Sequence, residues 1–257
     1  MHTNRNSKPK SSTAVKNLIP KILENPLLKS FDTLHQSIPF SSIQPEHFIP
    51  ALKENIKNAL TGIDEVVRQT APPTFENTVE ALQNAGELLE RNSSILFNLN
   101  SAETSEAIQE VTQQASPLLT QFQNDVRLNQ ALFERIKTIY ENQEQENLSV
   151  EQQTLLEKEY KGFARNGALL AEDEKNILRE IDTEKAQLGL SFGENVLADT
   201  QAFELHITDE KDLEGLPDQV KEMAAETAQS KDKEGWVFTL DYPSYVPLMT
   251  YAENRAL

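Results

Sequence analysis

The chain has 257 residues, of which 38% are hydrophobic and 25% are charged, so it is long enough to bury a substantial core. Its 24 basic and 41 acidic residues give a formal net charge of −17, which argues against nucleic acid or an anionic membrane as a partner, because both attract positive charge. The absence of cysteine excludes disulfides, thiol nucleophiles and cysteine-bound zinc. No apolar run approaches the ~20 residues of a membrane-spanning helix.

The first 23 residues differ in composition from the rest of the chain. They contain five basic residues and no acidic one, so the remainder carries −22, which is −17 less +5. They also lack the continuous apolar stretch of a secretory signal. We interpret residues 1–23 as a disordered basic tail, in preference to a transit peptide, because arginine is scarce. We expect one folded domain over residues 24–257.

Apolar residues recur at spacings of three and four through most of this domain, which is typical of amphipathic helices. Pro117 should kink the helix that contains it or divide that helix in two. Thr74 or Asn77 should cap the second helix, and the spacing of Asn77 and Glu80 suits mutual capping. Ser149 with Gln152 forms a capping box. The predicted helices run over about 44–68, 74–99, 103–124, 132–140, 149–163 and 173–200.

The only strand patterns lie near the C-terminus, where residues 203–208 and 236–241 alternate between apolar and polar. We expect these strands to pair in a hairpin over 202–241, around an acidic excursion. A last helix should begin at Tyr242 and run uncapped to Leu257. The predicted fold is therefore mainly α, a bundle of long antiparallel helices with one small β-hairpin-like excursion. Four side chains are expected on the buried side of the hairpin: Phe203, Leu205, Trp236 and Phe238.

The histidines offer no metal-site pattern, because no two of them have the i, i+4 spacing that places two ligands on one helical face. We interpret His47, next to Glu46, as a partly exposed residue of a first helical turn, and His206 as a surface residue of a strand. His35 and His2 are isolated in the sequence.

Other chemical motifs are also missing. The chain has no H-E-x-x-H, Gly-x-Gly-x-x-Gly, Walker or Gly-x-Ser-x-Gly sequence, and its acidic runs lack the glycine turn of a calcium loop. Arg165 is a candidate anion-binding residue, but a helix C-terminus capped by Gly167 explains its segment as well. We therefore assign no catalytic residue and no metal ligand, and the substrate-binding residues remain unknown.

Several short motifs follow one another along the chain. They occupy 45–52 (PEHFIPAL), 73–82 (PTFENTVEAL), 97–99 (FNL), 155–157 (LLE), 163–168 (FARNGA), 192–197 (FGENVL), 213–217 (LEGLP), 235–240 (GWVFTL) and 254–257 (NRAL). In this order they resemble the M3 family of zinc metallopeptidases, and within it the peptidyl-dipeptidase (dipeptidyl carboxypeptidase) branch. Oligopeptidase A is the next nearest branch.

The resemblance implies a clam-like helical enzyme that hydrolyses short, unstructured peptides in a deep channel and, in this branch, releases C-terminal dipeptides. Family members hold Zn²⁺ with an H-E-x-x-H helix and a downstream glutamate, and the motif glutamate serves as general base. The matched region lies upstream of these residues. We therefore interpret 24–257 as the neurolysin-like N-terminal half that walls the channel, without the catalytic zinc domain.

This interpretation carries expectations for the chain and for the full-length protein. The 257-residue chain alone should be inactive, and Zn²⁺ is implied only for the full-length enzyme. Expected partners are short peptides, the missing C-terminal catalytic domain and, for the isolated chain, further copies of itself through exposed apolar surface. The family setting implies a cytoplasmic protein. The alternative is a stand-alone, non-catalytic helical module that binds a peptide or a protein.

Overall fold

The computed structural model describes residues 25–145 and 147–257, so the predicted basic tail lies outside the described residues. The chain divides into two compact units, Met1–Gln187 and Leu188–Leu257. Most described residues are helical, and one small two-stranded sheet lies near the C-terminus, which confirms the mainly α expectation. In the described part of the chain, no helix is both long and apolar enough to cross a membrane.

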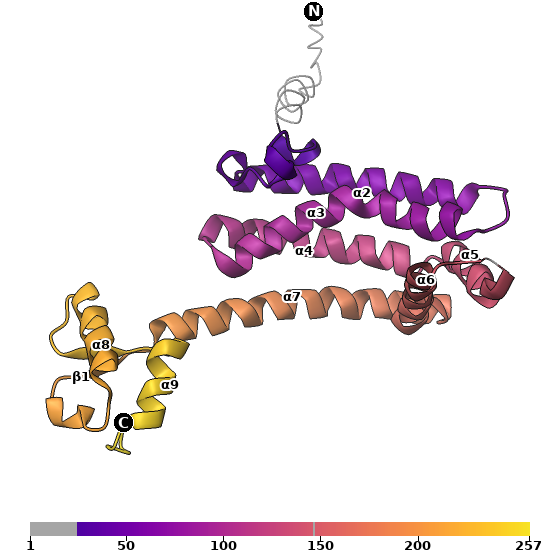
Figure 1. The fold of residues 1–257 in the computed structure, drawn as a ribbon. Coiled ribbons are helices and arrows are strands. Elements are labelled where there is room, and N and C mark those ends of the chain that lie inside the picture. The colour runs from indigo at the N-terminus through magenta and orange to yellow at the C-terminus, as the bar shows by residue number, and fades with distance from the viewer. Residues whose placement is uncertain (1–24, 146) are drawn as a thin grey trace, which may run out of the picture. The chain divides into compact units, whose positions relative to one another are not determined.

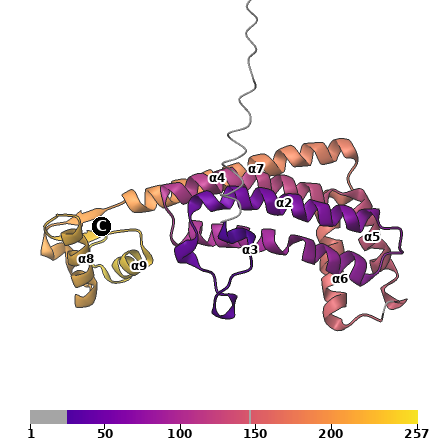
Figure 2. The same ribbon diagram turned by 90° about the horizontal axis from the view of Figure 1, so that it is seen from above.

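The first unit is built on three long helices that run antiparallel to their neighbours (Figures 1 and 2). Short loops join them, and two shorter helices and the beginning of α7 complete the unit. A π-helical turn, Phe75–Glu80, leads into α3, and another, Ala164–Ala168, follows α6. The helices are α2 Pro45–Arg68, α3 Ala81–Ala102, α4 Glu106–Arg127, α5 Gln130–Glu141, α6 Val150–Phe163 and α7 Glu172–Ala202.

Side-chain caps stabilise the beginnings of several of these helical segments. The predicted Ser149–Gln152 capping box is confirmed, with the Gln152 side chain accepting from the Ser149 backbone N–H at 2.9 Å. Of the two candidates for the cap of the second predicted helix, Thr74 is confirmed as the N-cap, whereas the pairing of Asn77 with Glu80 is wrong. Thr74 and Asn77 cap each other instead, because the helical segment begins at Phe75, and the Asn77 backbone N–H donates to the Thr74 hydroxyl at 3.2 Å.

Helix α4 passes through Pro117 as one element, so the expected division there is wrong. A proline inside a helix removes one backbone hydrogen bond and crowds the preceding turn. Ala115 and Leu119, on either side of Pro117, are both buried in the core. We attribute the continuity of the helix to this packing, because the burial of apolar side chains on both sides of the proline offsets the loss of one hydrogen bond.

Two apolar clusters form the core of the first unit. One joins the early part of α2 to α3 and α4, with Phe48, Leu52 and Leu96 fully buried. It also holds Leu27 of the lead-in segment, whose carbonyl accepts a hydrogen bond from Asn92 Nδ2 at 2.7 Å. The second cluster lies around α5 and α6 and contains the stacked rings of Phe133 and Phe163.

The second unit contains the predicted hairpin. Strand β1 (Leu205–Ile207) pairs antiparallel with β2 (Trp236–Phe238), and Leu205 lies opposite Phe238. Helix α8 (Asp218–Ser230) and helix α9 (Tyr242–Tyr251) pack in the same unit, whose core includes Leu213 and Leu248. The expected burial of Phe203 is wrong, because the paired strand begins only at Leu205 and the Phe203 side chain is exposed.

The last helix ends earlier than its sequence predicts. Helix α9 stops at Tyr251, so the expected continuation to Leu257 is wrong. The Glu253 backbone N–H donates to the Glu214 carbonyl at 3.0 Å, and Asn254 Nδ2 donates to Asp212 at 2.8 Å. Gly215 permits this approach, since its φ is +89° and a Cβ there would lie 2.2 Å from the Tyr251 carbonyl oxygen.

Helix α7 is present as predicted, but its apolar side chains are not in a core. In the first unit its side chains reach α4 and α5 through polar contacts: Arg179 with Asp125 at 2.8 Å, and Lys175 with Gln130 at 3.2 Å. Among the described residues of α7, Lys175 is the one that is buried. Five large apolar side chains of α7 are exposed: Ile177, Ile181, Leu188, Phe192 and Val196.

Candidate functional site

The described histidines, His35, His47 and His206, belong to no group of potential metal ligands. His47 is half-buried, and its Nδ1 accepts a hydrogen bond from the Gln44 backbone N–H at 3.0 Å, so it caps α2. His206 is exposed, as predicted, and its Nε2 lies 2.6 Å from the Glu234 carbonyl oxygen. Across residues 25–145 and 147–257, no group of three or more histidine, aspartate and glutamate residues is placed to hold a metal ion.

The acidic runs of α6 are used in ion pairs within the protein. Glu157 pairs with Lys161 one turn away, and these contacts lower the pKa of the Glu157 carboxyl. Glu159 pairs with Arg127 of α4 at 2.8 Å. The Arg165 side chain is exposed. Gly167 has a φ of +97°, a left-handed backbone conformation that suits a glycine cap at the C-terminus of a helix.

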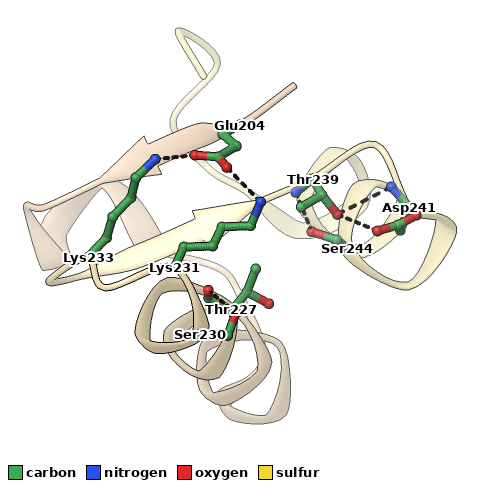
Figure 3. A network of polar contacts seen from close by, with 8 residues as sticks. All are labelled: Glu204, Thr227, Ser230, Lys231, Lys233, Thr239, Asp241 and Ser244. Carbon is green, nitrogen blue, oxygen red and sulfur yellow. Dashed lines mark hydrogen bonds and ion pairs between the residues drawn. The ribbon is translucent and has the colours of Figure 1, made fainter. Parts of the chain in front are cut away.

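A polar network in the second unit ties Glu204, the residue before β1, to the segment between α8 and β2 (Figure 3). The Glu204 carboxylate accepts a hydrogen bond from Lys231 Nζ at 2.6 Å and another from Lys233 Nζ. Hydrogen bonds from the two ammonium groups lower the pKa of Glu204 to about 2. Both carboxylate oxygens are therefore occupied, and we interpret this network as a structural clamp and not as a ligand site.

A hollow of about 420 Å³ lies in the first unit, over α3 and α4. Its lining combines apolar side chains with a few polar groups, which is typical of sites that bind small molecules or peptides. Gly86 of α3 forms part of its wall. The apolar lining residues are Ile63, Leu82, Leu89, Leu119, Phe122 and Val126.

One end of the hollow is held in place by a polar group of three residues. Glu159 accepts from Arg127 Nη1 at 2.8 Å and from Gln83 Nε2 at 3.1 Å, so α3, α4 and α6 meet there. The Arg127 guanidinium also lies over the Phe163 ring, 4.7 Å from its centroid. The remaining polar lining residues are Glu90, Ser93 and Gln123. The ion pair with Glu159 and the contact with the Phe163 ring together hold the Arg127 guanidinium in one orientation.

A second hollow of about 370 Å³ continues the first one along the two helices. The two hollows share Ser93, Leu119 and Gln123, so they form one depression, which we call the α3–α4 groove. The far end of the groove is lined by Phe97 and Ser116. None of these residues was identified as functional from the sequence. The one feature that could have pointed to the groove is Gly86, a glycine in the interior of a predicted helix.

The chain is similar to a family of peptidases. Residues 49–175 match the model of the "Neurolysin/Thimet oligopeptidase, N-terminal domain" family. Oligopeptidase A of Salmonella typhimurium is 32% identical over 235 residues, which are 91% of this chain and 34% of that protein.

Two further relatives that are also named as peptidases match a similar share of this chain. Dipeptidyl carboxypeptidase of Salmonella typhimurium is 32% identical over 234 residues, covering 91% of this chain and 33% of that protein. The organellar oligopeptidase A of Arabidopsis thaliana, described as chloroplastic/mitochondrial, is 30% identical over 240 residues, covering 91% and 30%. The chain therefore spans about a third of the length of the curated relatives it matches.

Proposed function

Residues 49–175 belong to the family of neurolysin and thimet oligopeptidase N-terminal domains, and on this premise we propose that the whole protein is a zinc-dependent peptidase acting on short, unstructured peptides. The observation that carries this proposal is the match over 91% of the chain to proteins named as peptidases. The chain contributes the helical wall of the substrate channel, and the catalytic region follows it in the full-length protein.

The finer specificity in this proposal is release of dipeptides from the C-terminus of the substrate. The ordered motifs support it because they resemble the peptidyl-dipeptidase branch. Relatives named oligopeptidase A and dipeptidyl carboxypeptidase are equally similar to the chain, at 32% identity. Internal cleavage of peptides is therefore the competing specificity, and the reaction products distinguish the two.

The described residues do not fit the zinc site of this proposal. They contain no cluster of three histidine or carboxylate side chains, so we derive no step of hydrolysis from them. In the proposed enzyme the ligands would come from an H-E-x-x-H helix and a glutamate outside the chain. The 257-residue chain is proposed to be inactive by itself.

The test begins with the coding sequence beyond Leu257. We expect an open frame that encodes H-E-x-x-H and a downstream glutamate. The full-length protein, translated from the whole reading frame, should release dipeptides from a nine-residue peptide, as detected by mass spectrometry. It should lose this activity when a chelator is added and regain it when Zn²⁺ is added. The control is the 257-residue chain with Zn²⁺, which should leave the peptide intact.

Three results would overturn parts of this proposal. A whole-frame protein that cleaves no peptide removes the peptidase function, and one that cuts only internal bonds removes the dipeptidase specificity. Hydrolysis by the 257-residue chain removes its assignment as a non-catalytic wall. If the frame closes after Leu257, the stand-alone binding module becomes the better interpretation.

The proposed location is the cytoplasm, and cell fractionation with an antibody to the chain tests it.

A further inference from the structure

Gly86 has no structural explanation in the packing of the first unit. A glycine inside a helix is less favourable than alanine, so it usually has a reason in packing or function. Gly62 on α2 has such a reason, because a Cβ there would lie 3.1 Å from the Ala85 Cβ. Apart from its own chain neighbours and the nearby backbone of α3, a Cβ on Gly86 would meet no described atom within 4 Å. Gly86 therefore leaves open space in the wall of the α3–α4 groove.

The charges of the groove are unequal. Arg127 and Glu159 neutralise each other at one end, at 2.8 Å. Glu90 is one helical turn from Gly86 on the same face of α3, and it is exposed. Its carboxylate makes no ion pair and no side-chain hydrogen bond with any residue that the structure describes. The groove therefore presents one uncompensated negative charge beside an apolar wall, in a chain whose net charge is −17.

The length of the groove favours an extended chain over a compact ligand. Its lining on α4 runs from Ser116 to Arg127, which is roughly 16 Å at about 1.5 Å per residue. An extended peptide advances about 3.3 Å per residue, so about five residues fit along it. Gln123 and Ser93 lie where the two hollows join. The Gln123 side-chain amide can donate to and accept from a peptide backbone, whereas the Ser93 hydroxyl donates to the Leu89 carbonyl at 2.8 Å and offers its oxygen as an acceptor.

We propose that the α3–α4 groove binds an extended peptide of about five residues, with an apolar side chain over Gly86 and a neighbouring basic side chain paired with Glu90. The choice of a peptide rests on the proposed function. The shape and the charge that select its side chains rest on the groove alone. The groove would thus give this chain affinity for basic, apolar peptides without any catalytic group.

The test uses the 257-residue chain and a fluorescein-labelled, C-terminally amidated pentapeptide, Ala-Arg-Phe-Arg-Ala, in a fluorescence anisotropy titration. Gly86→Leu places a side chain in the open space, and Glu90→Gln removes the charge. Each should weaken binding by about tenfold, the effect of losing one good contact. The matched controls are Gly189→Leu on α7, also at a position with nothing within 4 Å of its Cβ, and Glu65→Gln on α2, an exposed carboxylate in the same unit. Both controls should bind as the unchanged chain does.

Two further peptides test the chemistry of recognition. Ala-Glu-Phe-Glu-Ala should bind more weakly because its charges repel Glu90, and Ala-Arg-Ala-Arg-Ala should bind more weakly because it leaves the space over Gly86 empty. The proposal would be overturned if the unchanged chain does not bind the peptide. It would also be overturned if Gly86→Leu and Glu90→Gln bind the peptide as tightly as the unchanged chain does. Glu90→Gln changes an exposed side chain, so it keeps the test decisive if Gly86→Leu misfolds. Absence of binding in the groove would not affect peptide hydrolysis by the full-length protein. A failure of the groove proposal can therefore be distinguished from a failure of the proposed peptidase function.

Discussion

Arg127 of α4 and Glu159 of α6 form an ion pair at 2.8 Å between positions 32 residues apart in the chain. The Glu159 side chain is only 12% exposed, and the guanidinium of Arg127 covers the Phe163 ring. Gly162 allows this approach, because a Cβ there would lie 3.3 Å from Arg127 Nη1. The pair therefore closes one end of the α3–α4 groove and holds α6 against α4.

Replacing Arg127 should destabilise the first unit. Arg127→Ala leaves the Glu159 carboxylate largely buried with only Gln83 as a hydrogen-bond donor, and it uncovers Phe163. We expect a loss of about 1–3 kcal/mol in the free energy of unfolding, measured by urea denaturation followed by circular dichroism.

The control for this prediction is Arg68→Ala on α2. Arg68 also makes an ion pair at 2.8 Å, with Asp64, but both side chains are mainly exposed. Exposed pairs contribute less than about 1 kcal/mol, so this variant should unfold near the unchanged chain. Equal losses in the two variants would mean that the burial of Glu159 contributes nothing.

Two glycines should respond to alanine in opposite directions. Gly167 has a φ of +97°, and a Cβ there would lie 2.5 Å from Leu178 Cδ2 and 2.9 Å from Leu128 Cδ2. Gly167→Ala should therefore destabilise the chain by about 1–3 kcal/mol. Gly189→Ala lies in the interior of α7 with open space around it, so it should stabilise the helix by about 0.5–1 kcal/mol. Thermal unfolding curves measure both, and a stabilising Gly167→Ala would contradict the strained geometry.

The helices could be predicted because their signals are local. Ser149 and Gln152 are three residues apart, and such a cap depends on little else. The sequence left Thr74 and Asn77 as alternative caps, because polar residues near a helix start compete for the same role, and the structure has Thr74 as the N-cap. Division of the helix at Pro117, one of the two outcomes expected there, does not occur. A local rule for proline does not include the burial of Ala115 and Leu119 on either side.

The features that the sequence did not predict depend on contacts between distant residues. The alternation around Phe203 shows which side chains share a face, but pairing with β2 begins only at Leu205. The apolar stripe of α7 likewise identifies one helical face and does not say what covers it. The α3–α4 groove joins residues as far apart as Gln83 and Glu159, so no spacing in the sequence predicts it.

The contribution of Glu204 to stability should disappear in acid. Its pKa is lowered to about 2 by Lys231 and Lys233, so the folded second unit favours the charged carboxylate. A lowered pKa in the folded state gives stability that is complete above the ordinary value near pH 4.3 and is lost as the pH falls toward about 2. We expect Glu204→Gln to lower the denaturant midpoint at pH 7, and the difference from the unchanged chain to shrink between about pH 5 and pH 2.

The control for the pH prediction is Glu226→Gln on α8. Glu226 is exposed, and no ion pair is found for it among the residues with a described structure. Its substitution should leave the midpoint nearly unchanged at every pH. Added salt should reduce the effect of Glu204→Gln, since the Glu204 pairs are partly exposed to solvent. A constant difference between pH 7 and pH 2 would exclude titration of Glu204 as the cause.

The exposed apolar side chains of α7 should make the isolated chain self-associate. Leu188, Phe192 and Val196 recur at a spacing of four along the helix, so they share one face, and Phe192 is 71% exposed. Contiguous exposed apolar surface favours association because burial removes it from water. We expect the weight-average mass from light scattering to rise with protein concentration. The double variant Leu188→Ser and Phe192→Ser should lower that rise, whereas Val150→Ser, at an isolated exposed position on α6, should not. A monomer at all concentrations would show that this face needs no partner.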